Sequence, residues 1–155
     1  MTDNAEQMPP LQVNAQYIKD LSFEVPGAPG IYGELAPTAP EISVRVDLSA
    51  APLRENVFEV VLQLAVDAKV GEHTAFIVEL SYGGVFTLNL PQEHMQPVLL
   101  IECPRLLFPF ARNIVADVTR EGGFPPMMLQ PIDFVTLFRS RMEQMAQQAQ
   151  TEGNA

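Results

Sequence analysis

The stretch VFEVVLQLAVDAKV at residues 57–70, followed by AFIVELSYGGVFTL at residues 75–88, decides the fold. In the first run the even positions from Phe58 to Val66 are apolar, whereas Glu59, Gln63 and Asp67 occupy odd positions. Successive side chains of a strand point to opposite faces. The two runs therefore predict an antiparallel hairpin with one buried and one polar face. No catalytic cluster lies on the polar face, which favours a docking surface over a reaction site.

Two further strands are predicted upstream of this hairpin. Odd positions in residues 13–25 are largely apolar and even positions largely polar, with Lys19 and Ile18 as exceptions. Residues 42–48 alternate without exception. Between these strands, residues 26–40 contain four prolines and three glycines, which predicts a long loop without helix interior or strand ladder. Long loops in compact domains are often functional, and this one contains Ile31, Tyr32 and Leu35.

The hydrophobic period changes after the fourth strand, where Gly83-Gly84 suggests a bulge or bend. A helix is predicted from Pro91 to about residue 101, ended or kinked by Pro104. A second helix runs from residue 105 to the stop at Gly122-Gly123. Residues 124–126 form a rigid linker, and Pro131 opens a last helix that reaches about residue 145.

A run of strands followed by a run of helices predicts an α+β fold, a four-stranded antiparallel sheet with the C-terminal helices packed on one face. The 155 residues suit a single domain, expected at residues 11–145, with a flexible N-terminus at 1–10 and a disordered tail at 146–155. The helices offer more apolar surface than this sheet can cover, which predicts oligomerisation. The spare residues are Leu99, Leu100, Leu106, Phe108, Met127 and Met128.

The amino-acid composition limits the classes of molecule that the protein is expected to bind. Nineteen acids against nine Lys and Arg give a net charge of −10, which disfavours binding to nucleic acid and to anionic lipid. The charge serves solubility or attracts a basic partner, and composition does not separate these two interpretations. One cysteine, an acidic start and no apolar run near the roughly 20 residues of a membrane span predict a soluble, cytoplasmic protein.

Competing chemistry is sparse. Cys103 as nucleophile with His94 as base is one possibility, but Cys103 precedes Pro104 in an apolar run, where a buried cysteine acts as a small hydrophobe. The spacing of His73, His94 and Cys103 does not suit zinc. The glycine pairs lack the Lys and Ser or Thr of a phosphate loop. The sequence therefore predicts no catalytic, cofactor or metal site.

Several segments occur in the order found in one family. They are YIKDLSFE at 17–24, AFIVE at 75–79, GGVF at 83–86, CPRLLFPFAR at 103–112, GFPP at 123–126 and PIDF at 131–134. Together they resemble SecB, the cytoplasmic protein-export chaperone family of Gram-negative bacteria, over residues 13–142. The resemblance implies an ATP-independent holdase that keeps precursor proteins unfolded and delivers them to the motor ATPase SecA. It also implies a homotetramer, a dimer of dimers, without cofactor or enzymatic activity.

The resemblance also assigns surfaces. The SecA contact corresponds to Asp20 and Glu24 on the first strand and to Ile77 and Glu79 on the fourth. Parity independently groups Asp20 with Glu24 on the polar side of the first strand, and Ile77 with Glu79 on one side of the fourth. SecB proteins often end in a longer acidic tail that contacts SecA, whereas residues 151–155 contain one acid, so this contact is not expected.

For a holdase, we expect a client groove between the proline-rich loop and the helices. Ile31, Tyr32 and Leu35 would form one wall, and Phe134 and Phe138 the other. Apolar residues at such spacing are equally suited to the core. Two other functions remain open at this point, a carrier of small apolar ligands and a small hydrolase or isomerase with an unrecognised site.

Overall fold

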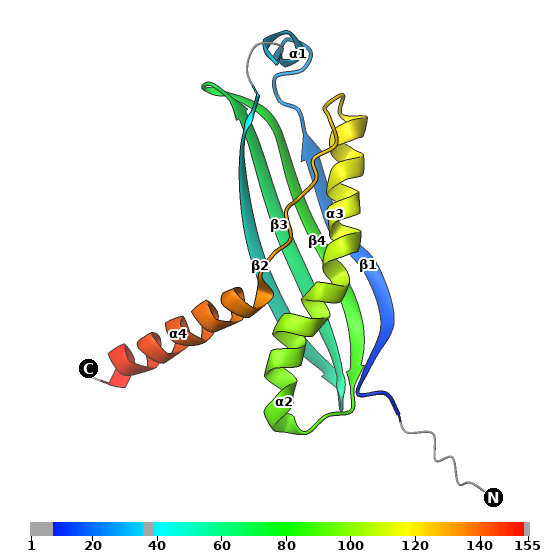
Figure 1. The fold of residues 1–155 in the computed structure, drawn as a ribbon, viewed down its shortest axis with the longest axis vertical. Coiled ribbons are helices and arrows are strands. Elements are labelled where there is room, and N and C mark those ends of the chain that lie inside the picture. The colour runs from blue at the N-terminus through cyan, green and yellow to red at the C-terminus, as the bar shows by residue number, and fades with distance from the viewer. Residues whose placement is uncertain (1–7, 36–38, 154–155) are drawn as a thin grey trace, which may run out of the picture.

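The computed structural model describes residues 8–35 and 39–153. Four strands, β1 (Leu11–Glu24), β2 (Glu41–Arg54), β3 (Val57–Val70) and β4 (His73–Leu88), form one antiparallel sheet in the order β1-β4-β3-β2 (Figure 1). The predicted strand number and antiparallel pairing are confirmed. β2 continues six residues beyond the predicted end, through Pro52, because an edge strand tolerates a residue that lacks a ladder donor.

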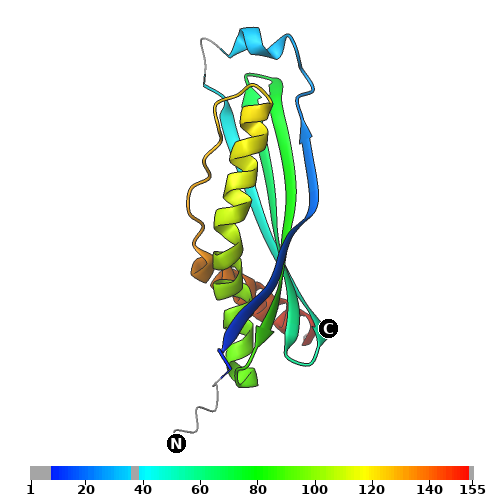
Figure 2. The same cartoon turned by 90° about the vertical axis from the view of Figure 1, so that its right-hand side faces the viewer.

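One nearly continuous helix follows the sheet. It consists of α2 (Gln92–Pro97), a π-helical turn (Val98–Glu102) and α3 (Cys103–Glu121). The helix therefore continues through Pro104, which excludes the end there that the sequence offered as an alternative to a kink. Proline clashes with the carbonyl four residues before it in a regular α-helix, and the wider π turn lies immediately before Pro104. α3 lies along one face of the sheet (Figure 2).

The glycine pair of β4 makes no bulge, which excludes one of the two alternatives, a bulge or a bend, that the sequence suggested. β4 stays in register with β3 through Gly83 and Gly84, and the register shifts lie in β1 instead. Each glycine makes room for a side chain. A Cβ on Gly84 would lie 2.9 Å from Leu107 of α3, and one on Gly83 would lie 2.8 Å from the ring of Tyr17. The close approach of Leu107 on one face of the sheet and of Tyr17 on the other explains why both positions are glycine.

The proline-rich loop and the N-terminus contain more structure than the sequence suggested. The proline-rich loop contains a short helix, α1 (Ile31–Glu34), and residues 36–38 of this loop lie outside the described residues. Pro9 and Pro10 of the expected flexible N-terminus accept hydrogen bonds from Asn89, and residues 1–7 lie outside the described residues.

The last helix, α4 (Phe134–Gly153), begins after Asp133 rather than at Pro131. The Asp133 carboxylate accepts hydrogen bonds from the backbone N–H and the hydroxyl of Thr136 at 3.1 and 2.8 Å, as an N-cap does. Residues 146–153 continue α4 where the sequence suggested a disordered tail, and they are exposed. Alanine and glutamine favour helix even without an apolar face. Residues 154–155 lie outside the described residues.

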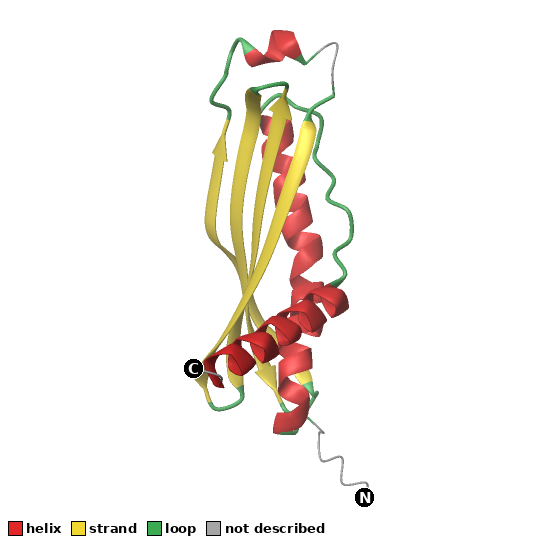
Figure 3. Cartoon of the chain, turned by 90° about the vertical axis from the view of Figure 1, so that its left-hand side faces the viewer, coloured by secondary structure: helices red, strands yellow, loops and turns green. Residues whose placement is uncertain are grey.

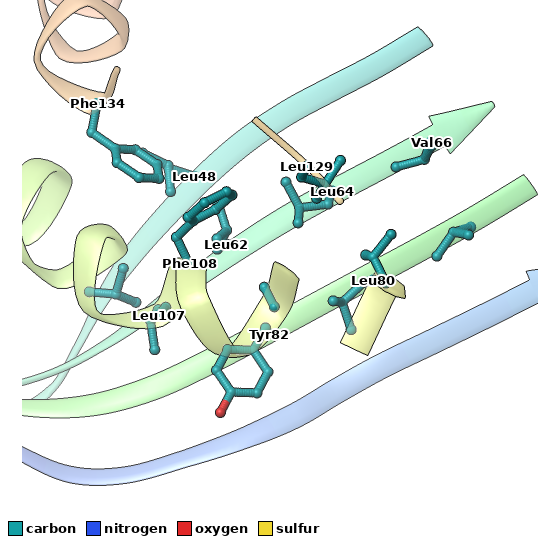
Figure 4. Close-up of a cluster of buried hydrophobic side chains, with 14 of the residues drawn as sticks. Leu48, Leu62, Leu64, Val66, Leu80, Tyr82, Leu107, Phe108, Leu129 and Phe134 are labelled. Carbon is teal, nitrogen blue, oxygen red and sulfur yellow. The ribbon is translucent and has the colours of Figure 1, made fainter. Parts of the chain in front are cut away.

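The core lies between the sheet, α3 and the extended segment that leads to α4. Phe134 at the start of α4 is 2 % exposed and packs against Phe108 of α3, with a ring-centre distance of 6.3 Å. Figure 4 shows it close to Leu48 of β2. α4 then leads away from the sheet past β2 (Figures 1 and 3). These contacts define one covered face and leave the other available.

Candidate docking face and client groove

The strand register brings the four residues assigned to motor contact onto one face. Glu24 of β1 pairs with Ile77 of β4, and Ser22 pairs with Glu79. Asp20 pairs with Ser81, one step along the same face. Paired residues of an antiparallel ladder point to the same side of the sheet. We call Asp20, Glu24, Ile77 and Glu79 the docking face.

The docking face lies opposite α3. Even positions of β4 point toward the helix, as the ring stacking of Tyr82 on Phe110 shows, so Ile77 and Glu79 point the other way. Asp20, Glu24 and Glu79 are exposed, while Ile77 is partly buried. In the part of the chain that the structure describes, no helix lies over this area (Figures 2 and 3). The face is thus anionic, accessible and partly apolar.

Charge continues from the docking face across the sheet. A shallow hollow lies beside Asp20 and Glu79 and reaches β2. Its polar lining residues are Asp20, Arg45, Asp47, Gln63, Glu79 and Ser81. A ligand seated here would meet carboxylates from β1, β2 and β4, which suits a partner with several basic groups.

The five residues predicted to form the client groove do not meet in the described residues. Ile31 is 3 % exposed and Phe134 is 2 % exposed, so both belong to the core. Leu35 and Phe138 pack against that core from its periphery. α1 lies at one end of the molecule, and α4 begins much farther along it (Figure 1). The two expected walls are therefore apart, and the segment from Phe124 to Asp133 lies between them.

Tyr32 connects α1 to the end of α3. Its hydroxyl donates a hydrogen bond to the carbonyl of Gly122 at 2.6 Å, and its ring centre lies 5.5 Å from that of Phe124. The side chain still keeps 39 % of its surface exposed. Tyr32 is thus both a structural link and an accessible aromatic surface.

A groove that the sequence did not predict runs between β2 and the extended segment. It has a volume of about 390 Å³. Its lining residues, which we call the β2 groove, are Val44, Val46, Met127, Met128, Leu129, Gln130 and Ile132. Val44 is 42 % exposed and Met128 is 50 % exposed. The sequence analysis treated residues 124–126 as a linker and named Met127 and Met128 only as spare apolar surface, which was the signal available for a groove here.

The thiol of Cys103 has no accessible surface. Burial raises its pKa to about 12, and the neighbouring Glu102 acts in the same direction. A thiolate nucleophile is therefore disfavoured at neutral pH. No three His, Cys, Asp or Glu side chains in residues 8–35 and 39–153 gather as metal ligands. Among the same residues, no helix has the length and apolarity to cross a membrane.

Comparison with known proteins decides the family. The family model "Preprotein translocase subunit SecB" matches residues 4–145. The chain belongs to the SecB family. A SecB export protein of Paramagnetospirillum magneticum is 59 % identical, with 94 % of this chain and 95 % of the relative aligned. One from Granulibacter bethesdensis is 58 % identical, with coverages of 95 % and 90 %.

A solved structure of a SecB-like chaperone has the same fold. A SecB-like chaperone from Mycobacterium tuberculosis, solved with a peptide of an antitoxin, superimposes with a TM-score of 0.66. The aligned region covers 79 % of this chain and 91 % of the M. tuberculosis chain, and the sequences are 14 % identical. SecB is a family of protein-export chaperones, so membership makes this protein a chaperone and not an enzyme.

Proposed function

We propose that this protein is an ATP-independent holdase that binds unfolded precursors and delivers them to the motor ATPase SecA. The observation that carries the proposal is the separation of two surfaces on one sheet. The β2 groove lies on the helix side of the sheet, and the docking face lies on the opposite side. Client and motor can therefore bind at the same time, as delivery requires.

The β2 groove, with Tyr32 and Leu35 toward α1, supplies client contacts. A holdase binds many unrelated chains, so adaptable side chains such as Met127 and Met128 suit it better than a closely fitted pocket. Each contact is weak, but several grooves that bind segments of one chain can raise affinity by factors of about 10² to 10⁴. Ile31, Phe134 and Phe138 support this surface from the core and would reach a client only after α1 or α4 moved.

The docking face supplies the motor contact. Asp20, Glu24 and Glu79 attract a basic surface over distance, and Ile77 provides apolar area that is buried on contact. A partner of this kind binds more weakly as ionic strength rises.

A homotetramer, a dimer of dimers, supplies the several grooves. Leu99, Leu100 and Phe108, which the sequence suggested as spare apolar surface, are buried within the chain. Other apolar side chains remain exposed on β1 and α3, around the stacked rings of Tyr82 and Phe110. We call this set the β1–α3 patch, and it consists of Val13, Ile18, Leu21, Leu106 and Phe110.

We place the protein in the cytoplasm, where precursors meet the motor before translocation. Its single cysteine is buried and reduced, which a reducing compartment maintains without further protection.

Two assays on the purified protein test the proposal. Aggregation of a denatured secretory precursor on dilution should be suppressed without ATP, and SecA should bind at low salt. The double variant Asp20→Lys with Glu79→Lys should lose SecA binding and keep aggregation suppression. The double variant Glu143→Lys with Glu152→Lys, at two exposed positions of α4, makes the same change of charge and should keep both activities. Precursor aggregation that proceeds unchanged, or SecA binding that survives the double variant, would overturn the respective half of the proposal.

A further inference from the structure

A bulge in β1 determines which residues reach the docking face. Ile18 pairs with Tyr82 and the next pair is Asp20 with Ser81, so Lys19 is an extra residue in the ladder. In a regular strand, residues three apart point to opposite faces. Because of the extra residue, Tyr17 and Asp20 share the open face. Without it, Leu21 and Phe23 would take the open side instead of Asp20 and Glu24.

One carboxylate contacts the chain on both sides of Ile18. The hydroxyl of Tyr17 donates a hydrogen bond to Oε2 of Glu59, and Nζ of Lys19 donates to Oε1 at 2.8 Å. Glu59 belongs to β3, so both contacts cross β4. The ring of Tyr17 makes this crossing above Gly83, where a Cβ would come within 2.8 Å of it. We call Tyr17, Lys19 and Glu59 the Glu59 clamp.

The clamp holds its protonation state at neutral pH. The hydrogen bonds from Lys19 and Tyr17 lower the pKa of the Glu59 carboxyl, which therefore stays ionised. Burial, together with Glu59, raises the pKa of Tyr17 to about 12, so its hydroxyl keeps the proton that it donates. The side chain of Glu59 is only 20 % exposed, whereas that of Lys19 is 50 % exposed.

We propose that Glu59 is a positioning residue for motor docking, because it fixes the β1 bulge that turns Asp20 and Glu24 toward the open face. This inference rests on the proposed docking function and adds a residue outside the four assigned to it.

The rest of β1 does not fix the bulge by itself. Phe23 anchors the end of the strand from the helix side, with its ring centre 6.1 Å from that of Phe76 and its edge against Gly122. Phe23 thus opposes a slip of the whole strand. Lys19 and Asp20, which form the bulge, are exposed, so core packing does not hold them in place. The bulge therefore depends on the Glu59 clamp. Removal of the clamp should therefore loosen the segment around Asp20 and leave the fold intact.

Two variants test the clamp without a change of surface charge. Tyr17→Phe keeps the ring over Gly83 and removes the donated hydrogen bond. Gly83→Ala, at a buried position, displaces the ring. Each should weaken SecA binding by roughly tenfold, the lower end of the effect of one lost hydrogen bond to a charged group, while aggregation suppression stays at the wild-type level. Amide exchange at Lys19 and Asp20 should accelerate in both.

A double-mutant cycle separates positioning from direct contact. Asp20→Asn should reduce SecA affinity less in the Tyr17→Phe background than in the wild type, because the clamp acts through Asp20. Full additivity, or unchanged affinity in both clamp variants, would overturn the inference. If Asp20→Lys with Glu79→Lys also leaves SecA binding intact, the docking function itself fails. If only that double variant loses binding, docking stands and the clamp is dispensable.

Discussion

The hydroxyl of Thr119 accepts a hydrogen bond from the backbone N–H of Met127 at 2.9 Å and donates to carbonyls of its own helix, Val115 and Ala116. Thr119 has no exposed surface, and it is the polar residue that ties the extended segment to α3. The shape of the β2 groove depends on this tie, because Met127 lines the groove.

Thr119→Val should therefore lower the free energy of unfolding by about 1–3 kcal/mol, since the N–H of Met127 loses its partner. It should also reduce client capture at temperatures where the fold is intact. Urea unfolding and precursor light scattering measure the two effects. Thr119→Ser keeps the hydroxyl and is expected to retain groove function. Equal unfolding free energies for Val and Ser at this position would contradict the assignment.

Met128 is expected to contact clients directly. It is 50 % exposed at the groove, whereas Met145 is 56 % exposed on α4, outside the groove. A photocrosslinking residue at 128 should capture an unfolded precursor, and the same residue at 145 should capture much less. Crosslinkers at Tyr32 and Leu35 test the α1 end of the surface, and failure to capture precursor there would remove these two residues from the proposal.

Arg141 fixes the direction of α4. Its Nη1 donates a hydrogen bond to the carbonyl of Leu48 on β2 at 2.6 Å. Arg141→Met should lower the free energy of unfolding by about 1 kcal/mol. The main measurable effect should be faster amide hydrogen exchange along α4. Arg139→Met is the neighbouring exposed control and should leave exchange unchanged. Identical exchange in both variants would show that packing of Phe134 alone positions the helix.

Stability should fall at alkaline pH for a specific reason. Burial raises the pKa of Cys103 from the ordinary 9.0 to about 12. Between these values the unfolded chain releases a proton that the folded chain keeps, so the free energy of unfolding decreases as pH rises. Well below pH 9 this group contributes no slope. Tyr17 adds the same effect from 10.0 to about 12. Cys103→Ala should flatten the profile between pH 9 and 10, and an unchanged slope would contradict burial of the thiol.

The sheet could be predicted because alternation is a local signal. Every even position of residues 57–70 is apolar, and the structure has β3 over those residues. β1 carries two register shifts, so parity assigned Tyr17 to the wrong face while it grouped Asp20 and Glu24 correctly. A bulge depends on contacts from other strands, here from Glu59, and no window of β1 alone contains them.

The exposure of apolar residues was predicted less well than the sheet, because it depends on which of them the chain packs into its own core. Ile31 and Phe134 have the same local appearance as accessible apolar residues, but tertiary packing buries them. The extended segment lacks any periodic pattern, so Met127 and Met128 indicated an apolar surface but not that it would lie against β2. The boundaries of α4 show the same limit. The helix begins at the cap made by Asp133, and its exposed C-terminal part is helical although its polar sequence suggested disorder.

Subunit assembly should depend on the β1–α3 patch. Ile18 is 49 % exposed, lies opposite Tyr82 in the ladder, and thereby adjoins the ring stack of Tyr82 with Phe110. A lysine at position 18 would place a charge in the centre of this apolar surface. Burial of that charge against another subunit is costly, whereas the free chain can keep it in water.

Ile18→Lys should therefore shift the protein from tetramer toward smaller species in native mass spectrometry. Leu53→Lys makes the same change at a residue of β2 that is 53 % exposed and lies outside the patch, so it should leave the tetramer intact. Loss of the tetramer should also weaken capture of long precursors more than capture of short peptides, because only long chains span several grooves. If Ile18→Lys remains tetrameric while Leu53→Lys dissociates, the subunit contact lies on the β2 edge and the β1–α3 patch is free surface.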